Sequence, residues 1–396
     1  MAWGDTAVRV RPGIEILLTD RLDLLRGARV GAVVHPASVL SDLRHTADAL
    51  FEERSSRLTA LFGPQHGVRG EKQDNMIESE TYRDPDTQLP VYSLYAETRW
   101  PTEEMMRDID VLVFDLQDVG TRVYTFIYTM AYCMEACAQF ERRFIVLDRP
   151  NPINGRNVEG NILEKEFASF VGRYPLPMRH GMTVGELALL FNKGFGIGCD
   201  LTVVPLEGWK RDMWFEQTSL PWVPPSPNLP TIESTVVYPG MVLVEGTMLS
   251  EGRGTTRPFE LIGAPYINAR RFEGYLNDLQ LPGVWFRAAY FQPTFQKCAG
   301  TMCGGVQVHV LDREAFEPYL TGISTIAAVR ALYPERFAWR EPPYEYEFTR
   351  LPIEILCGTK SLPQLMDAGA SPEAIRATWQ TDIAGFLNLR DPYLLY

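Results

Sequence analysis

The sequence predicts an α/β fold in which helices cover both faces of an open parallel sheet, followed by a smaller α+β domain. Three observations support this prediction. Short apolar runs without a polar face recur through the first half, and helix-like segments separate them. A proline-rich stretch then divides this half from a second half with a different pattern.

Five apolar runs predict the strands of the sheet. They are rich in Val, Ile, Leu and Phe, as buried parallel strands are, and they span residues 29–34, 57–62, 111–116, 144–148 and 201–206. Helix-like segments lie at residues 45–55, 101–109, 125–140 and 183–195. The last of these begins with Thr183 and has Glu186 three residues on, the pattern of a capping box. In a parallel sheet of this kind, ligands bind beyond the carboxyl ends of the strands.

The proline-rich stretch at residues 221–231 predicts the domain boundary, because five prolines in eleven residues forbid regular structure. We place one domain at residues 1–228 and the other at residues 229–396. For the second domain the pattern predicts helices and strands in alternation. The helices are expected at 269–279, near 324–333 and from 371 to 390, and the strands at 284–291 and 305–311.

Charge and composition restrict the partners and the compartment. With 38 basic against 50 acidic residues, a net charge of -12, the chain lacks the excess of Lys and Arg that nucleic-acid binding needs. The sequence begins without the apolar core of a signal peptide, and no later run reaches membrane-spanning length. We therefore expect a cytoplasmic protein with no nucleic-acid or membrane partner.

Ionisable and amide residues follow several of the predicted strands. They are Gln65 and His66, then Asp115, Gln117, Asp118 and Arg122, then Asp148, Arg149 and Asn151, and finally Arg179 and His180 just before a predicted helix. Each group has a structural alternative, because a carboxylate can cap a helix or pair with a nearby arginine. Several such groups in one half of the chain nevertheless predict a site at this edge of the sheet.

Two kinds of cofactor site lack their motifs. There is no GxGxxG after the first predicted strand and no GxxxxGK[ST] anywhere, so we expect neither NAD nor ATP. His66, His180 and the strand-end aspartates could converge on a metal, but no HExxH-like spacing supports this. We expect a site without a metal or an organic cofactor.

Carboxylates and amides among aromatic residues favour a carbohydrate ligand. Cleavage of a glycosidic bond needs one carboxyl group to protonate the leaving oxygen and a second to act as base or nucleophile. The candidate platforms for a sugar ring are Trp100, Tyr124, Tyr128, Trp222 and Tyr238. Glu245, Glu251 and Arg253 lie just past the proline-rich stretch, where they could face the strand ends across a cleft.

Six motifs occur in the order found in one known family. They are FGPQHGVRG, VLVFDLQDVGTRVYTFIYTM, LDRPNPING with the following VEGNIL, PMRHGMTVGELA, PPSPNLPT and EGTMLSEGRGTTRPFE. In these motifs, from about residue 15 onward, the chain resembles the NamZ-like exo-acting β-N-acetylmuramidases of bacterial cell-wall recycling. The resemblance implies a Rossmann-like, mostly parallel N-terminal domain, a smaller C-terminal domain and an active site in the cleft between them. It also implies release of N-acetylmuramic acid from the non-reducing end of peptidoglycan fragments, without a cofactor.

Combined with the motifs, the resemblance gives a pool of candidate site residues. The candidate catalytic residues are Glu71, His66, Asp115, Asp118, Glu245 and Glu251, with Glu71 and Glu251 leading because they lie in polar, glycine-flanked surroundings. The candidate substrate-binding residues are Gln65, Arg69, Gln117, Arg122, Tyr124, Arg149, Asn151, Arg179, His180, Asn228, Arg253 and Thr255. Among them Arg69, Arg179 and Arg253 are candidates for the lactyl carboxylate of the sugar, because arginine suits bidentate carboxylate binding.

Gln65 departs from the family pattern, in which many members carry Glu at this position. An amide cannot donate a carboxyl proton, so this chain would use Glu71 or His66 instead, or have altered activity. The departure leaves a second hypothesis open, a non-catalytic protein that binds muropeptides on the same scaffold. A metal-dependent hydrolase is the third.

Overall fold

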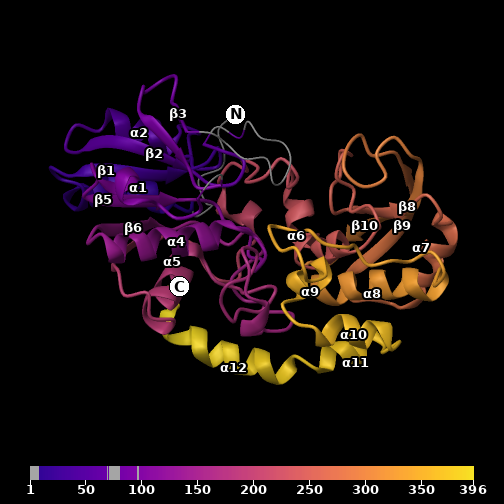
Figure 1. Cartoon of the computed structure of the whole chain (residues 1–396). Helices are drawn as coiled ribbons and strands as arrows, with labels where there is room; N and C mark the ends of the chain where they lie inside the picture. The colour runs from indigo at the N-terminus through magenta and orange to yellow at the C-terminus, as the bar shows by residue number, and fades with distance from the viewer. Residues whose placement is uncertain (1–8, 69, 71–80, 96–97) are drawn as a thin grey trace.

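The first half of the chain forms a seven-stranded sheet. The computed structural model describes residues 9–68, 70, 81–95 and 98–396 (Figure 1). The strands are β1 (Arg29–Val34), β2 (Arg57–Gly63), β3 (Tyr82–Arg83), β4 (Pro90–Ser93), β5 (Val111–Asp115), β6 (Arg143–Leu147) and β7 (Asp200–Val204). Their order across the sheet is β3-β4-β2-β1-β5-β6-β7, and only β3 runs antiparallel to its neighbour. The prediction of a mostly parallel sheet is confirmed.

The five predicted strands are β1, β2, β5, β6 and β7, each within two residues of its expected ends. The sequence did not indicate β3 and β4, which are two and four residues long. Runs this short give no periodicity, and β4 begins with a proline. They extend the sheet beyond β2, so the carboxyl end of β2 lies inside the sheet and not at its edge.

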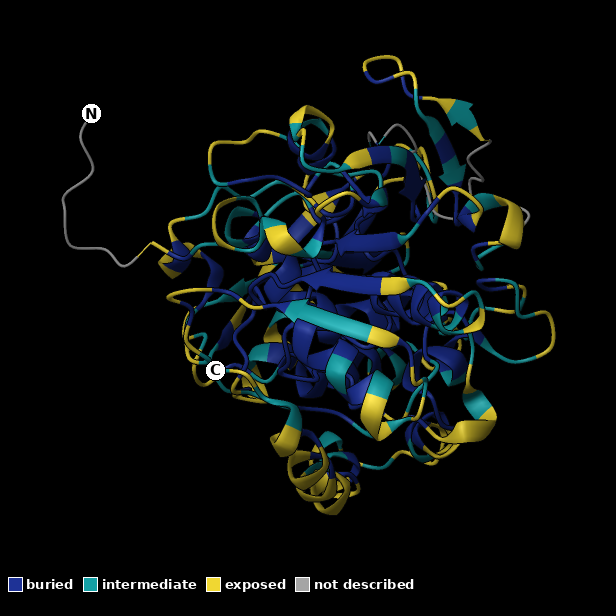
Figure 2. Ribbon diagram, turned by 90° about the vertical axis from the view of Figure 1, so that its left-hand side faces the viewer, coloured by how far each residue is buried: buried dark blue, intermediate teal, exposed yellow. Residues whose placement is uncertain are grey.

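Helices cover both faces of this sheet. They are α1 (Gly13–Asp20), α2 (Thr46–Glu52), α3 (Glu103–Met106), α4 (Phe126–Gln139) and α5 (Val184–Leu189). In β5, Val111 and Val113 belong to the apolar cluster that includes α1 and α2, whereas Leu112 and Phe114 belong to the cluster that includes α4 and α5. The strands are therefore apolar on both sides, which explains their continuous apolar runs. Figure 2 shows these buried strands at the centre of the molecule.

The predicted capping box at the start of α5 is present. The Thr183 side chain accepts from the Glu186 amide, and the Glu186 carboxylate accepts from the Thr183 amide at 3.0 Å. The Thr183 hydroxyl also donates to Asp148 at 2.8 Å, which ties the loop after β6 to this helix.

The second half contains a three-stranded antiparallel sheet and most of the remaining helices. Its strands are β8 (Leu261–Ala264), β9 (Val284–Phe291) and β10 (Cys303–Val310), in the order β8-β10-β9. Its helices are α6 (Ile232–Met241), α7 (Ala269–Asp278), α8 (Pro318–Leu332), α9 (Pro352–Cys357), α10 (Ser361–Asp367), α11 (Pro372–Ala377) and α12 (Gln380–Arg390). No helix within the described ranges is long and apolar enough to cross a membrane.

The prediction of one helix from 371 to 390 is wrong, because the structure divides this stretch into α11 and α12. The break lies at Trp379, which is 1% exposed and packs edge-on against Tyr319 at 5.3 Å. Burying this indole fixes the direction in which the chain turns, a tertiary constraint that a polar helical pattern does not reveal.

Two glycines allow α6 and α8 to cross at close range. A Cβ atom on Gly240 would lie 1.7 Å from the Pro318 carbonyl oxygen, and one on Gly322 would lie 2.2 Å from the Gly240 carbonyl oxygen. Only glycine fits at either position. This crossing holds α6, which runs directly into the short helical segment η5 (Val242–Gly246), against the second half.

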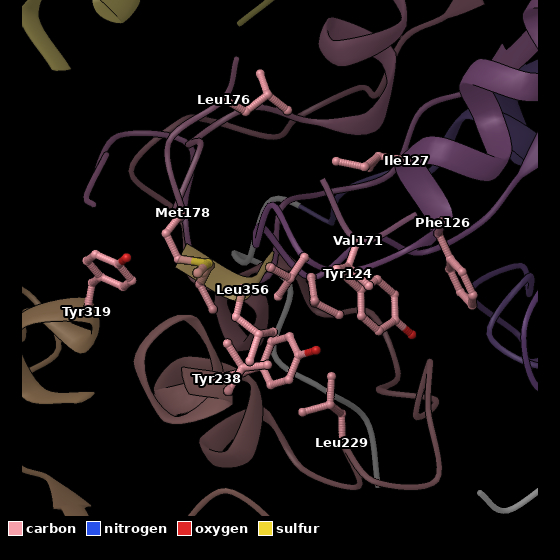
Figure 3. Packing of buried hydrophobic residues seen from close by; sticks show 14 of the residues in the cluster. Tyr124, Phe126, Ile127, Val171, Leu176, Met178, Leu229, Tyr238, Tyr319 and Leu356 are labelled. Carbon is pink, nitrogen blue, oxygen red and sulfur yellow. The ribbon is translucent and has the colours of Figure 1, made fainter. Parts of the chain in front are cut away.

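The two halves share one apolar core. Figure 3 shows Tyr124, Val171 and Met178 of the first half close to Tyr238 and Leu356 of the second. Residues 221–231 connect the halves without helix or strand. The exact boundary at residue 228 stays a prediction.

A buried arginine adds polar contacts across the same junction. Arg122 is fully buried and donates to four backbone carbonyls, of Asn161, Leu176, Leu356 and Cys357, at 2.6 to 3.0 Å. Two of these carbonyls precede the proline-rich stretch and two follow it. The guanidinium therefore fixes one half against the other.

The last helix leads back to the first half, where Tyr396 binds a buried carboxylate. The Tyr396 hydroxyl donates to Asp148 at 2.7 Å and accepts from the Leu206 amide at 2.6 Å. Burial raises the pKa of Asp148 to about 7, although the bonds from Tyr396 and Gly185 oppose the increase. Figure 1 shows α12 lying below both halves on its way to this contact.

We expect Tyr396→Phe to lower the free energy of unfolding by about 1–3 kcal/mol, because it leaves the buried Leu206 amide without its partner and removes one of the hydrogen bonds to Asp148. Urea denaturation at pH 7 measures this change. Tyr393→Phe is the matched control, since no hydrogen bond of the Tyr393 hydroxyl is present among the described residues. Equal stability of the two variants would contradict the proposed anchoring.

Candidate active site

A polar pocket lies where the two halves meet, and both contribute to its lining. The first half contributes Gln65, His66, Tyr124, Thr125, Ser226 and Asn228, and the second contributes Tyr238, Glu245, Arg253, Tyr344 and Glu345. Carboxylates, neutral hydrogen-bonding groups and aromatic rings are therefore gathered in one place. Of the predicted residues, Gln65, His66, Tyr124, Asn228, Glu245 and Arg253 lie in this lining.

Gln65 and His66 enter the pocket directly after β2. His66 has a positive φ of 74°, an uncommon conformation for a residue with a side chain, which turns the chain sharply at the strand end. Its Nε2 lies 3.2 Å from the Ser226 hydroxyl. Gln65 accepts from the Thr125 hydroxyl at 2.9 Å.

Glu245, carried by η5, is held in its ionised form. Its carboxylate accepts from Arg253 Nη2 at 2.6 Å and from the Tyr344 hydroxyl at 2.7 Å. Burial alone would raise the pKa of Glu245, but the charge of Arg253 and the two hydrogen bonds outweigh it, so this pKa is lowered.

Glu251 lies beside the pocket and supports Arg253. Its carboxylate is 3.4 Å from Arg253 Nε and 2.7 Å from Lys297 Nζ. Lys297 also donates to the carbonyls of Val244 and Thr247 at 2.9 Å. Glu251 is thus engaged in an ion-pair network and does not line the pocket.

Glu345 reaches the pocket from a tight turn. The amides and carbonyls of Tyr344 and Glu347 exchange two hydrogen bonds of 2.9 Å, which makes Glu345 and Tyr346 the central pair. Both central residues have positive φ, 44° and 68°, where Asn and Gly are usual. Each such residue costs on the order of 1–3 kcal/mol, so the surroundings must hold the turn.

Contacts from the first half hold this strained turn. The Arg99 guanidinium lies 3.9 Å from the centre of the Tyr346 ring, a cation–π distance. The Tyr95 hydroxyl donates to Glu345 Oε2 at 3.0 Å. Strain maintained in this way is typical of residues placed for function.

The surroundings of Glu345 favour its protonated form. Burial is the largest cause and raises its pKa to about 7, and the nearby Glu245 charge adds to the increase. The hydrogen bond from Tyr95 opposes it. Two glutamates in one pocket therefore have pKa values displaced in opposite directions.

Other predicted residues form buried contacts outside the pocket lining. Asp115 accepts from Arg149 through both oxygens, at 2.6 and 2.8 Å, and also from the Thr46 hydroxyl at 2.5 Å. Asp118 accepts from the Gly120 amide at 2.8 Å and lies 3.2 Å from a ring nitrogen of His180. These pairs connect the loops that follow β5 and β6.

The remaining predicted residues bind backbone groups. Gln117 donates to Pro150, Asn151 to Met182, Arg179 to Ile153 and Thr255 to Gly252, in each case to a carbonyl oxygen. Arg122 spans the two halves, as described above. Arg69 and Glu71 lie outside the described residues. The structure thus gathers the central part of the predicted set and distributes the rest through the loops around it.

The sequence did not indicate four polar residues of the lining, which are Thr125, Ser226, Tyr344 and Glu345. It also did not indicate Tyr95, which binds Glu345 from outside the lining. Glu345 and Tyr344 lie in a segment without a strand-end position or a recognised motif, a hundred residues from Glu245 along the chain. The alternation of Tyr and Glu in YEYEF was the available signal, and it is weak. Among the described residues, no group of three or more His, Cys, Asp or Glu side chains could hold a metal ion.

The fold and the pocket define a two-part α/β protein that holds, between its halves, one glutamate with a raised pKa and one with a lowered pKa. Family models described as exo-β-N-acetylmuramidase NamZ match the chain, the N-terminal one over residues 30–233 and the C-terminal one over residues 236–396. The chain belongs to the NamZ family.

Individual relatives agree with this assignment. The chain is 51% identical to the peptidoglycan β-N-acetylmuramidase NamZ of Bacillus subtilis over 98% of its own length and 92% of the relative. Crystal structures of two DUF1343 family proteins from Bacteroides fragilis are similar, with TM-scores of 0.89 and 0.77 at 38% and 32% identity. Both similarities cover 98% of this chain and 99% of the other.

We expect Arg253→Met to lower the free energy of unfolding by about 3–5 kcal/mol at pH 7, because it leaves Glu245 and Glu251 buried without their shared cation. Urea denaturation measures the change, and the double variant Glu245→Gln with Arg253→Met should recover part of it. Arg44→Met is the matched control. Arg44 forms an exposed pair with Glu52 at 3.2 Å and should contribute less than about 1 kcal/mol.

Proposed function

We propose that this chain is an exo-acting β-N-acetylmuramidase, a glycoside hydrolase that releases N-acetylmuramic acid from the non-reducing end of peptidoglycan fragments. Family membership supports the activity and the substrate class. The observation that carries the chemistry is the pair Glu345 and Glu245, in one pocket with opposite protonation preferences. Paired carboxyl groups whose environments separate their pKa values are a recurring sign of acid and base roles.

In this proposal Glu345 is the general acid. Its pKa of about 7 keeps it protonated under neutral conditions, so it can transfer a proton to the glycosidic oxygen as the bond to the anomeric carbon breaks. Positive charge then develops on the sugar ring. The ionised Glu245 lies in the same pocket, where its negative charge stabilises that cation and receives a proton from the attacking water.

Arg253 is the proposed partner of the lactyl carboxylate. One of its terminal nitrogens binds Glu245, whereas Nη1 is buried and has no hydrogen-bond partner among the described residues. A buried donor without a partner is costly, and a substrate carboxylate would satisfy it. The sequence proposed Arg253 together with Arg69 and Arg179. Arg179 contacts the Ile153 carbonyl instead, and it lies outside the pocket lining.

Neutral side chains and aromatic rings of the pocket would bind the rest of the sugar. Asn228 and Ser226 offer hydrogen-bonding side chains, and His66 has one ring nitrogen near Ser226. The rings of Tyr124 and Tyr238 meet edge to face, with centres 6.3 Å apart. Neutral donors beside an apolar ring face are the combination that a pyranose needs.

Glu345→Gln should abolish the transfer of the proton. We expect kcat for a disaccharide of N-acetylmuramic acid and N-acetylglucosamine to fall by roughly 10²–10⁴. The loss should be much smaller for 4-nitrophenyl N-acetylmuraminide, because nitrophenolate leaves without protonation. In the unaltered enzyme, kcat/KM for the disaccharide should decline as the pH rises through about 7, since Glu345 then loses its proton.

Glu347→Gln is the matched control, because Glu347 belongs to the same turn but accepts from Thr349 and does not line the pocket. It should retain the activity of the unaltered enzyme. Full disaccharide turnover by Glu345→Gln would remove Glu345 as the acid. Saturable binding of the disaccharide by the unaltered chain without turnover would overturn the proposed activity.

The role of Arg253 predicts a preference between two sugars. A charged hydrogen bond contributes about 1.5–3 kcal/mol, so kcat/KM for 4-nitrophenyl N-acetylmuraminide should exceed that for the N-acetylglucosaminide by roughly 10–150-fold. The two substrates differ only in the lactyl ether. Equal rates would mean that the pocket does not bind the lactyl carboxylate.

A further inference from the structure

A line of hydrogen bonds leads from the end of β2 to the proposed acid. The Thr125 hydroxyl donates to Gln65 Oε1 at 2.9 Å, and Gln65 Nε2 donates to the Tyr95 hydroxyl oxygen at 3.2 Å. Tyr95 in turn donates to Glu345 Oε2 at 3.0 Å. All four side chains are at least nine-tenths buried.

The order of donors and acceptors fixes the direction of each bond. Because the Gln65 carbonyl oxygen faces Thr125, its amide nitrogen faces Tyr95, and an amide nitrogen can only donate. The Tyr95 oxygen therefore accepts from Gln65. Its single hydroxyl proton is directed to Glu345.

This direction decides which oxygen of Glu345 carries the proton. Oε2 accepts from Tyr95, and the carbonyl oxygen of a neutral carboxyl group is a stronger acceptor than its hydroxyl oxygen, so this bond favours the proton on Oε1. No hydrogen bond from any described residue reaches Oε1. Since Glu345 lines the pocket, Oε1 is the oxygen available to a bound substrate.

We infer that Gln65 and Tyr95 are positioning residues for the proposed reaction, which keep the proton of Glu345 on Oε1. The inference rests on the proposed function of Glu345 as the acid. Gln65 acts through Tyr95 and needs no contact with the substrate.

An acidic side chain at position 65 would reverse the arrangement. An ionised carboxylate only accepts, so it would compete with Glu345 for the Tyr95 proton. It would also add a negative charge near Glu345, whose pKa the charges of Glu245, Arg253 and Arg99 already affect. Both effects disfavour the carboxylate form of Glu345. Without the bond from Tyr95, neither oxygen of Glu345 is favoured to carry the proton.

The test compares pH profiles of the disaccharide activity in three variants, Gln65→Glu, Tyr95→Phe and Thr125→Val. We expect each to lower kcat, with Tyr95→Phe losing roughly 10–100-fold and KM changing little. The pH at which kcat declines on the basic side should be higher in Tyr95→Phe, because the lost hydrogen bond favoured the charged form of Glu345. The same pH should be higher still in Gln65→Glu. Thr125→Val should give a smaller loss, since it releases Gln65 without removing it.

Tyr92→Phe is the matched control, because Tyr92 lies on β4 and packs against Phe62, outside the pocket lining. Its profile should equal that of the unaltered enzyme. Thermal unfolding of each variant distinguishes misfolding from a change of mechanism. If one variant does not fold, the pH profiles of the other two test the inference.

The outcomes separate this inference from the proposed function. If Glu345→Gln is inactive on the disaccharide but the basic limb is unmoved in the folded variants, the acid stands and the positioning inference is wrong. Increased activity of Gln65→Glu would also overturn it, because position 65 would then supply the proton itself. If Glu345→Gln is fully active, the proposed function fails first.

Discussion

The fixed contact between the two halves is the constraint on which the pocket depends. Gln65, Tyr95 and Asn228 come from one side of the proline-rich stretch, and Glu245, Arg253 and Glu345 from the other. A hydrogen bond such as that from Tyr95 to Glu345 exists only while the halves keep their relative position. Arg122 provides this, because its guanidinium satisfies four carbonyls and would be left buried and charged if the halves separated.

The apolar core around Arg122 makes the same junction rigid. Tyr238 and Leu356 pack with Tyr124 and Met178 in one continuous buried cluster. Burial of this kind explains why the pocket can hold side chains with displaced pKa values. The apolar core has a low dielectric constant, which strengthens the interactions between charged side chains at its edge.

The protonation difference between Glu245 and Glu345 follows from their hydrogen-bond partners rather than from burial, since both are almost fully buried. Glu245 has the cation Arg253 and a phenol, whereas Glu345 has one phenol and a carboxylate neighbour. Tyr344 connects the two, because its hydroxyl binds Glu245 and its backbone begins the turn that carries Glu345. That turn places Glu345 in the same pocket as the ionised Glu245, whose charge adds to the effect of burial in raising the pKa of Glu345.

Local patterns predicted the sheet and half of the pocket. The strands were visible because burial on both faces favours apolar residues at nearly every position, and the capping box at Thr183 is a pattern of nearby residues. Strand-end polarity indicated His66 and Gln65, which the structure places in the pocket lining. It did not separate them from Asp115 and Arg149, which have the same type of position but bind each other. Glu345 was missed because its role depends on contacts with Tyr95 and Arg99, some 250 residues away along the chain.

The neutral side chain at position 65 also matches the charge balance of the pocket. Glu245 and Glu251 are negative and are matched by Arg253 and Lys297, while Glu345 contributes no charge when it is protonated. An additional carboxylate at position 65 would lie in the same pocket as Glu245 and Glu345 and would add to the negative charge there. It would raise the pKa of Glu345 further and would compete for the Tyr95 proton. An amide avoids both effects, and it still provides the donor that directs Tyr95 toward Glu345.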